Sequence, residues 1–527
     1  MVRKVGNTFL FIFTCLFFLA TLYHLYLGDS FSHFNFTPYI FIRKAIPPAV
    51  TPLPYTISSV SILMPDWEVS VIVSPDYTPQ GPCVCVFGTG ETTLARIAGE
   101  LRFPVQSLFK CEFPKRARLK LPYKQPKFMK SLEDKPPSMA APNLLKWSFL
   151  VYNSLTTEDD VILFVKGLNH CQGINRERNE FRCVFGYQGK MVIKTNVTSL
   201  IQEVIRRNGP DPTIFKGEKI SVSIKIVRPV SMIVPSVAYY SNTPRKLEQN
   251  ENSERAHLCA CTMVYNVGKF LKEWVLYHSK IGVVKFVLYD NASDDDLRKL
   301  VDELVQDGYD VKTYFWLWPK TQETGFSHSA IYAKDACSWM MYIDVDEFVY
   351  SPLWSNILRP SKSLLQNPKN VQDQSFDKRQ SSHSITGVTQ GYKCRRKVEN
   401  RYKSIVFLDV VDYSLLNMIH HFTLKKGYRG KKMSSHDMVV NHYKFQAWPE
   451  FKAKFRRRVS AYVYDWTKQV NPCSNDRTPG LGYSPVEPKG WPLKFCEVYD
   501  NGLRNLTWRW FARNSPTPPH YRMAWQG

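Results

Sequence analysis

The sequence predicts an α/β domain built on a mostly parallel sheet, preceded by a β-rich domain and an N-terminal membrane anchor. Three observations support this. Residues 257–527 begin with strand-like apolar runs that alternate with amphipathic helical segments. Residues 55–240 carry short apolar or alternating runs separated by Gly and Pro. Residues 8–27 contain no Asp, Glu, Lys or Arg.

Composition limits the class of protein and of partner. The chain has 527 residues, of which 44% are hydrophobic, so it can bury a sizeable core and is no disordered tail. Lys and Arg number 70 against 46 Asp and Glu, which gives a formal net charge of +24. Such a balance favours an anionic partner: a nucleic acid, a membrane surface, a nucleotide or an acidic polysaccharide.

The N-terminal apolar run is long enough to cross a bilayer. Twenty helical residues rise roughly 30 Å. A signal peptide would have a shorter apolar core and small residues at its end, whereas this run ends in bulky side chains. We therefore expect a cytosolic tail (1–7), an uncleaved transmembrane anchor (8–28) and a Pro-rich stem (29–54), with the rest of the chain in the lumen as a single-pass type II protein. A lumenal address argues against nucleic acid as a partner.

Cysteines and sequons agree with a secretory compartment. One of the 12 cysteines, Cys15, lies in the predicted anchor, and several of the other eleven should form disulfides in an oxidising lumen. Because eleven is odd, one thiol stays unpaired or bridges two chains, which permits a homodimer without requiring one. Glycosylation sequons occur at Asn35, Asn196, Asn291 and Asn505.

The lumenal part divides into two predicted domains. Residues 55–240 are expected to form a β-sandwich-like domain. A polar, charged linker follows at 241–256, and the α/β domain occupies 257–527.

Within the α/β domain the elements are expected in a regular order. Helices are predicted at 267–282, 296–308 and 327–339, between strands near 258–264, 284–290, 311–318 and 340–350. Three strands end in polar residues, at Tyr265-Asn266, at Asp290-Asn291 and at Asp344 to Asp346. Ligands of open parallel sheets bind beyond the carboxyl ends of the strands, so these side chains are expected in one site.

The strand end at Asp344 gathers carboxylates in apolar surroundings. If the strand continues through this segment, Asp344 and Asp346 face the same side, and a divalent cation would cancel their repulsion. Oxygen ligands suit Mg²⁺ or Mn²⁺, whose open positions diphosphate oxygens can fill. Glu347 should face the other side and brace the loop through hydrogen bonds.

Other interpretations of the acidic segment are a solvated turn, an aspartyl nucleophile or an EF-hand. The second requires Thr or Val where this chain has Phe348, and the third requires wider spacing of the acids and a Gly. The solvated turn stays open from these residues alone.

An ordered set of motifs resembles glycosyltransferase family 92, and within it the plant β-1,4-galactan synthases. The set comprises "CTMVYNVGKFLKEWVLYHSKIG", "FVLYDNASDDD", "DACSWMMYIDVDEFVY", "RYKSIV" and "VVNHYK", and covers roughly residues 255–450. The resemblance implies a GT-A fold, UDP-galactose as donor, Mn²⁺ as cofactor and inversion at the anomeric carbon. It also implies β-1,4-galactan side chains of pectin as acceptor, a Golgi location and a carbohydrate-binding N-terminal domain.

The resemblance also implies roles for individual residues. The metal and diphosphate site would comprise Asp344, Asp346 and His442. The donor nucleotide would contact Tyr265, Asn266, Asp290, Asn291 and Lys403.

The remaining candidates come from the chemistry of an inverting transfer. One base must take the acceptor proton, and Asp437 is the first candidate and Glu497 the second. Acceptor contacts are predicted for His421, with its neighbour His420, and for Trp448.

Surface features add three further expectations. The basic run at residues 425–432 is interpreted either as a solvated loop or as a lid over the diphosphate. Asn196 and Asn505 are expected to carry glycans, whereas Asn291 lies in the predicted donor pocket and should be unmodified.

Two alternatives remain open. The first is a lumenal pectin-binding lectin or scaffold with a degenerate transferase fold. The second is a transferase of the same fold that uses another donor, such as UDP-arabinopyranose or UDP-glucose, because single side chains read the orientation of one hydroxyl.

Overall fold

The computed structural model describes most of the chain from residue 59 onward. The described residues are 59–74, 81–129, 141–169, 174–187, 190–210, 220–248, 254–359, 364–365, 374–375, 377–379, 388–391, 394–395, 397, 403–418, 420–444, 448–452, 489–490, 496–514 and 521–526. Among them, no helix has the length and apolar character needed to span a membrane. The anchor predicted at residues 8–28 lies outside these ranges, as does the predicted stem.

The first part of the β-rich region is a seven-stranded sheet with a core of its own. Its strand order is β6-β3-β4-β5-β2-β1-β7, and all neighbours are antiparallel except β1 and β7. The strands are β1 (Ser59–Leu63), β2 (Glu68–Val73), β3 (Cys83–Val86), β4 (Thr92–Arg102), β5 (Val105–Glu112), β6 (Lys127–Met129) and β7 (Leu145–Lys146). Side chains of alternate residues, such as Val69, Val71 and Val73, form its core.

The second part consists of two sheets that share one hydrophobic core, as in a β-sandwich. One sheet has the order β12-β13-β9-β8, and the other has β11-β10-β14-β15 with β16 paired to β14. Val161, Leu163 and Val165 of β9 enter the same core as Phe181 and Phe185 of β10. The strands are β8 (Leu150–Thr156), β9 (Asp160–Lys166), β10 (Phe181–Tyr187), β11 (Lys190–Asn196), β12 (Ser199–Ile201), β13 (Val204–Asn208), β14 (Ile220–Ile226), β15 (Met232–Ile233) and β16 (Tyr239–Tyr240).

The α/β region is organised by a second seven-stranded sheet, β19-β18-β17-β20-β25-β22-β28. Strands β19, β18, β17 and β20 run parallel, and β25 is antiparallel to β20. The strands are β17 (Ala256–Val264), β18 (Lys285–Asp290), β19 (Asp310–Phe315), β20 (Cys337–Tyr342), β22 (Gln374–Ser375), β25 (Ser404–Phe407) and β28 (Lys431–Lys432). The parallel part follows from the strand–helix alternation in the sequence.

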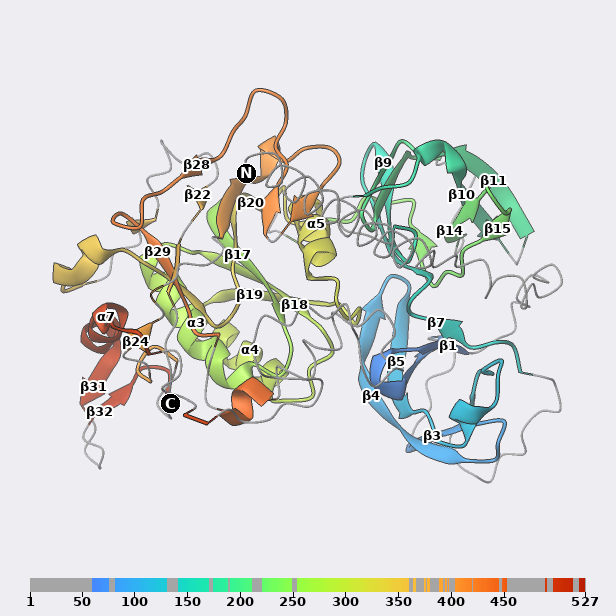
Figure 1. Cartoon of the computed structure of the whole chain (residues 1–527), viewed down its shortest axis with the longest axis horizontal. Helices are drawn as coiled ribbons and strands as arrows, with labels where there is room; N and C mark the ends of the chain where they lie inside the picture. Colours follow the sequence, from blue (N-terminus) through green and yellow to red (C-terminus); the bar gives the residue numbers. More distant parts are fainter. Residues whose placement is uncertain are drawn as a thin grey trace, which may run out of the picture. The chain divides into compact units, whose positions relative to one another are not determined.

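Helices cover both faces of this sheet. Trp274 of α3 (Gly268–Ile281) and Leu304 of α4 (Leu297–Gln306) pack in one core cluster, and Phe326 of α5 (Gln322–Tyr332) packs in another. Figure 1 shows α3 and α4 together on one side of the strands and α5 on the other. Strand residues alternate between the two clusters, so the parallel strands are apolar on both faces, as burial between helices requires.

Smaller elements complete the fold. A three-stranded sheet contains β21 (Glu347–Tyr350), β29 (Val439–His442) and β23 (Asp377–Arg379), and helix α7 spans Gly502–Phe511. Three separate strand pairs are β24 (Cys394–Arg395) with β30 (Val498–Tyr499), β26 (Asn417–Met418) with β27 (His421–Phe422), and β31 (Ala512–Asn514) with β32 (Tyr521–Met523). Short 3₁₀ helices occur at η1 (Pro65–Trp67), η2 (Ala117–Leu119), η3 (Arg178–Glu180), η5 (Pro352–Asn356) and η8 (Leu408–Val410).

Two predicted elements differ from the structure. The helix expected at 327–339 is α5, which begins at Gln322 and ends at Tyr332, and Cys337 already belongs to β20. The strand expected at 340–350 is broken, because β20 ends at Tyr342 and β21 begins at Glu347. Cys337 is held in strand conformation by pairing with Ala256 and by its disulfide to Cys259. Tertiary pairing thus overrides the helical pattern.

Disulfides, expected for an oxidising compartment, are present. The described residues contain Cys85–Cys111, Cys259–Cys337 and Cys394–Cys496. Each joins strands or strand ends that are far apart in sequence, by up to 102 residues for the last pair. Such links restrict the unfolded chain and so favour the folded one.

A buried carboxylate in α3 fixes a distant segment. Glu273 is fully buried and accepts hydrogen bonds from the backbone N–H of Val388, from the N–H of Thr389 (2.8 Å) and from the Thr389 hydroxyl (2.5 Å). Burial raises the pKa of Glu273 to about 7, although these hydrogen bonds oppose the rise. Next to them, Gln390 donates to Thr507 of α7, so the carboxylate also steadies the C-terminal helix.

We expect Glu273 to make stability depend on pH. Its folded-state pKa lies above the ordinary value of 4.5, so the native state binds the extra proton between these values. The stabilisation that comes from protonated Glu273 is complete below pH 4.5 and is lost as pH rises through 7. Over this range the free energy of unfolding falls by about 3 kcal/mol at most. Thermal unfolding from pH 5 to 8 should show the unaltered chain losing stability relative to Glu273→Gln. The exposed Glu100→Gln variant is the control, and parallel curves for Glu273→Gln would contradict the expectation.

The structure gives a physical reason why Asn291 should carry no glycan. Its side chain is only 5% exposed, and its amide nitrogen donates to the carbonyl oxygens of Trp316 (2.6 Å) and Trp318 (3.0 Å). A glycan on this nitrogen would replace one of its two hydrogens, and so remove one of these hydrogen bonds, and it would require space in the core. Asn196 and Asn505 are exposed.

Peptide mapping of the chain, produced in a eukaryotic secretory host, should therefore find Asn291 unmodified. Asn291→Gln should lower stability by about 1–3 kcal/mol, because the longer side chain leaves a buried carbonyl without its donor. A glycan occupying Asn291 in folded protein would overturn this expectation.

Candidate active site

The loops that follow β17 and β18 are joined at the carboxyl edge of the sheet. The backbone N–H of Asn266 donates to the hydroxyl of Ser293 (3.1 Å), and the Asn266 side chain accepts from the N–H of Asp294 (2.7 Å). Asn266 has φ of 50°, in the left-handed region that Asn tolerates better than most residues. Tyr265 donates to Asp294 at 3.5 Å. The structure thus brings together the polar ends of two neighbouring strands.

The predicted donor residues of the β18 loop have different surroundings. Asp290 accepts from the N–H of Ser293 (2.9 Å). Burial raises the pKa of Asp290, and its hydrogen bonds with Ser293 oppose that rise without cancelling it. Asn291 lies beside it but turns its amide nitrogen into the core, toward the Trp316 and Trp318 carbonyl oxygens. Asn291 therefore supports the loop from within.

The segment from Asp344 to Glu347 is a tight turn. The N–H of Glu347 donates to the carbonyl oxygen of Asp344 (2.9 Å), which closes the turn between β20 and β21. The expectation that Asp344 and Asp346 share a face of one strand is therefore wrong, because side chains alternate only along continuous strands. The two carboxylates have different neighbours.

Asp344 is held by protein groups. Its Oδ1 accepts from Gln322 Nε2 at the first residue of α5 (2.6 Å), and its Oδ2 accepts from Lys403 Nζ (2.9 Å). Lys403 is 1% exposed, and its ammonium also lies 2.9 Å from Glu347 Oε2 and 2.6 Å from His420 Nε2. A buried lysine thus neutralises part of the charge of the Asp344 carboxylate, whose role as a metal ligand stays a prediction.

Charge balance explains why Lys403 is tolerated in the interior. Burial disfavours its positive charge, but the Asp344 and Glu347 carboxylates outweigh that effect and raise the pKa of Lys403 above its ordinary value. Its ammonium contacts the side chains of Asp344, Glu347 and His420, and its predicted contact with the donor stays a prediction. We interpret Lys403 as a positioning residue that fixes the Asp344 turn.

Asp346 lies next to His442. Strand β29 pairs antiparallel with β21, and its register places His442 opposite Glu347. His442 Nε2 is 3.6 Å from Asp346 Oδ2, and its Nδ1 is 3.4 Å from Glu347 Oε1. The N–H of Tyr443 donates to the Asp346 carbonyl oxygen (2.8 Å), which fixes the turn against β29. The chain therefore brings together Asp346 and the late histidine, which are nearly a hundred positions apart.

Glu347 braces this arrangement, as the sequence analysis expected. It is fully buried, and its Oε2 accepts from the backbone N–H of Asp344 (3.0 Å) as well as from Lys403. One carboxylate thus joins the turn, the lysine and the histidine strand.

The predicted bases lie in exposed positions. Asp437 ends a turn before β29, where its N–H donates to the Ser434 carbonyl oxygen (3.0 Å). Glu497 adjoins β30 and accepts from the N–H of Lys397 (2.7 Å). The role of either as base stays a prediction.

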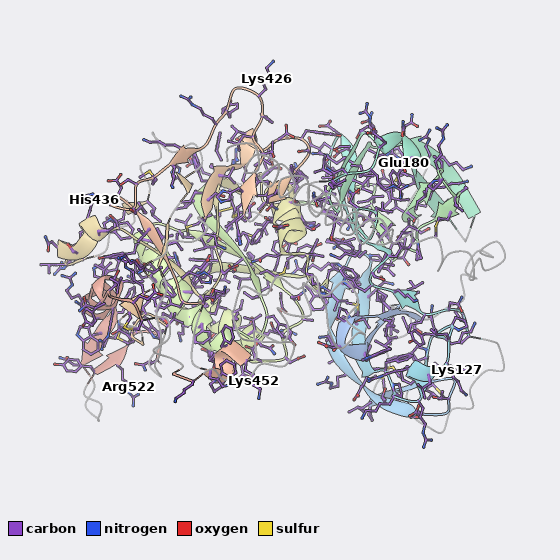
Figure 2. The ribbon with its side chains drawn as sticks, viewed as in Figure 1. Lys127, Glu180, Lys426, His436, Lys452 and Arg522 are labelled. Atoms are coloured by element: carbon purple, nitrogen blue, oxygen red, sulfur yellow. A yellow bond between two sulfur atoms is a disulfide. The ribbon has the colours of Figure 1, made fainter. Side chains whose placement is uncertain are left out.

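The predicted acceptor residues are more buried. His421 is half-buried in β27, and Trp448 is half-buried and stacks on Phe451 with ring centroids 5.7 Å apart. His420 is buried against Phe326 and Lys403, so it belongs to the Lys403 cluster. The basic run at 425–432 is exposed along its length, and Lys426 at its tip points away from the body of the domain (Figure 2).

Sequence reasoning missed two contacts of this site. Gln322 carries no motif, and only the packing of α5 brings its amide to Asp344. His420 was considered for the acceptor, but its left-handed backbone (φ 70°) directs it inward. The one available signal was "RYKSIV", which places a lysine directly before a buried strand, where unpaired charge is costly.

We expect Lys403→Met to destabilise the chain strongly. The variant leaves the carboxylate of Glu347 buried without its cation, which costs about 3–5 kcal/mol when one partner of a buried pair is removed. Chemical denaturation without metal or nucleotide measures this directly.

The matched control is Lys426→Met on the exposed loop, which should change stability by less than about 0.5 kcal/mol. The double variant Lys403→Met/Glu347→Gln should recover part of the loss, because both charges are then absent. Equal stability of the two Lys→Met variants would exclude a structural role for the Lys403 cluster.

Comparison with solved structures yields only weak likenesses. A Staphylococcus aureus TarS fragment (residues 1–349) has a TM-score of 0.20 and 8% identity over 29% of this chain and 48% of that one. Mycobacterium tuberculosis glucosyl-3-phosphoglycerate synthase, in complex with Mn²⁺, UDP and glucosyl-3-phosphoglycerate, has a TM-score of 0.17 and 10% identity over 30% of this chain and 58% of that one. Scores this low carry no argument about this chain.

Comparison of sequences is much clearer. The profile of glycosyltransferase family 92 matches residues 255–475, which include the turn and His442. A family 92 protein of Ricinus communis is 39% identical over 403 residues, covering 71% of this chain and 69% of the relative. One of Oryza sativa is 37% identical over 407 residues (71% and 68%), and one of Arabidopsis thaliana is 37% identical over 385 residues (69% and 67%). Likeness of this degree over more than two thirds of each relative shows that the chain belongs to glycosyltransferase family 92, and hence that it is a glycosyltransferase.

Proposed function

We propose that the chain is an inverting, metal-dependent galactosyltransferase that transfers galactose from UDP-galactose to β-1,4-galactan side chains of pectin. The observation that carries the proposal is the pair of Asp346 and His442 beside a turn whose first carboxylate is already neutralised by Lys403. The donor and acceptor come from the resemblance of the motifs to the galactan synthases.

The residues present fit a divalent cation that is shared with a nucleotide. Among the described residues, no three His, Cys, Asp or Glu side chains are grouped so that they could hold a metal ion by themselves. Asp346 and His442 offer two ligands, and Mg²⁺ or Mn²⁺ commonly takes one or two protein ligands plus substrate phosphates. When bound, Mn²⁺ would neutralise the charge that develops on the leaving UDP.

The surrounding residues have complementary roles in this proposal. Lys403 and Glu347 hold the turn so that Asp346 stays beside His442 before any ligand arrives. Tyr265, Asn266 and Asp290 form the neighbouring part of the edge and would contact uridine and ribose. Asp437 or Glu497 would take the acceptor proton, and His421 and Trp448 would contact the acceptor.

The cellular context is also part of the proposal. Three disulfides among the described residues favour an oxidising compartment such as the Golgi lumen. The predicted type II anchor would hold the enzyme at the Golgi membrane.

The test measures UDP binding to the purified chain by calorimetry, with Mn²⁺ and with EDTA. We expect binding only with Mn²⁺, and affinity about tenfold or more weaker in Asp346→Asn and in His442→Gln, because each variant removes one proposed ligand. Asp302→Asn on the exposed face of α4 is the matched control and should bind as the unaltered chain does.

A donor screen with a labelled galacto-oligosaccharide then addresses specificity. Transfer from UDP-galactose and not from UDP-glucose or UDP-arabinopyranose would support the proposed donor. Transfer from another donor alone would support the proposed site but assign it a different donor sugar. Binding of galactan without Mn²⁺-dependent UDP binding would indicate the lectin alternative.

A further inference from the structure

Helix α7 presents a glycosylation sequon and an aromatic ring on the same outward face. Leu503, Leu506 and Phe511 turn inward and are buried, whereas Asn505 and Trp508 are exposed. Residues three apart on a helix are neighbours on its surface. Aromatic side chains of a helix also lean toward its N-terminus. The ring of Trp508 and the amide of Asn505 are therefore neighbours on this face.

Trp508 is one member of an exposed aromatic pair. Its ring meets that of Tyr521 in β32, with ring centroids 5.6 Å apart and ring planes tilted by 55°. Trp508 is 44% exposed and Tyr521 is 52% exposed, so both rings present apolar surface to solvent. The C–H face of a sugar packs well on exposed aromatic rings of this kind. The pair thus forms a surface that suits a carbohydrate.

The aromatic pair also ties a weak strand pair to α7. Strands β31 and β32 form a two-stranded sheet, which is marginally stable by itself, and Figure 1 shows it beside α7. Its register places Arg513 directly opposite Arg522, where like charges are destabilising. Met523 is buried and anchors one end of β32 in the core. At the other end the contact of Tyr521 with Trp508 supports the strand, so a group that covers this contact would strengthen it.

The side chain of Asn505 is available for modification. Residues 505–507 form a complete Asn-X-Thr sequon, and the Asn505 side chain is exposed. Within the described part of the chain, its amide group forms no hydrogen bond. Asn291 differs, because its amide nitrogen is buried and donates to two carbonyl oxygens. A glycan on Asn505 would therefore break no hydrogen bond and would have room at the surface.

We propose that Asn505 carries an N-linked glycan whose first sugar ring packs on Trp508 and Tyr521 and so stabilises the β31–β32 pair against α7. The sugar is attached one helical turn from the rings, so the contact is intramolecular and does not depend on the concentration of a free ligand. Its C–H face meets the rings while its hydroxyl groups stay in water. The inference rests on the lumenal location in the proposed function, and it is independent of the donor and the acceptor.

Hydroxyl-radical footprinting read by mass spectrometry measures how accessible the two rings are. The full chain is produced in a eukaryotic secretory host, where peptide mapping should find Asn505 glycosylated. In Asn505→Gln, oxidation of Trp508 should be about threefold to tenfold faster, because the ring loses its cover. Trimming the glycan to its first sugar with an endoglycosidase should preserve the protection. Asn196→Gln removes the other exposed sequon and is the matched control, which should leave oxidation of Trp508 unchanged.

Hydrogen exchange of the β31 and β32 peptides provides a second readout. Exchange should be about threefold to tenfold faster in Asn505→Gln than in the glycosylated chain, because the strand pair opens more often. In the Trp508→Ala background, the same loss of the glycan should change exchange little, since the sugar then lacks its main contact. Chain from a bacterial host carries no glycan, and there Asn505→Gln should exchange as the unaltered chain does. That comparison separates the effect of the glycan from the effect of the substitution.

Three outcomes would overturn the proposal. The first is Asn505 without a glycan; if Asn196 also lacked one, the lumenal location would fail with it, whereas Mn²⁺-dependent UDP binding would still test the transferase separately. The second is equal oxidation of Trp508 with and without the glycan. If an added galacto-oligosaccharide then slowed that oxidation, the rings would bind acceptor in place of the glycan. The third is unchanged hydrogen exchange in Asn505→Gln, which would exclude the stabilising contact.

Discussion

The ammonium of Lys403, buried between Asp344 and Glu347, is the interaction on which the rest of the site depends. Three charged groups and His420 meet in a space where charge is costly unless it is paired. Two carboxylates and one lysine leave a net negative charge at the edge of the sheet, close to Asp346. A cation bound beside Asp346, as proposed above, would reduce that residual charge.

This constraint explains why segments far apart in sequence converge. Lys403 immediately precedes β25, the antiparallel neighbour of β20, so pairing of the two strands brings the lysine to the end of β20. On the other side of the turn, β21 pairs with β29 and brings His442 to Asp346. The turn is therefore held between two antiparallel pairings, one on each side. A shift in the register of either strand would move a charged side chain away from its partner.

The sequence was a good guide to the elements and a poorer guide to the contacts. Strand–helix alternation predicted the parallel strands, and because parallel strands end at one edge, the polar loops after β17, β18 and β20 were correctly expected together. Periodicity could not show that the apolar run breaks after Tyr342, since the residues on both sides are equally strand-like. The sequence also could not predict the partners of Asp344, because Gln322 and Lys403 approach it only through tertiary packing.

Left-handed backbone at non-glycine residues occurs in three parts of the described structure. The described residues include eight non-glycine residues with positive φ. Asn266, Ala292 and His420 lie in or beside the loops of the candidate active site. Gln202 lies in the β12–β13 turn, Lys320 precedes α5 and Leu415 precedes β26. Asp66 and Trp67 belong to η1. Helix α5 contacts residues near both of the first two groups, since its Gln322 donates to Asp344 and its Thr324 donates to Glu203 of the β12–β13 turn. Because one helical turn carries both contacts, the position of α5 determines where the Gln322 amide and the Thr324 hydroxyl are placed.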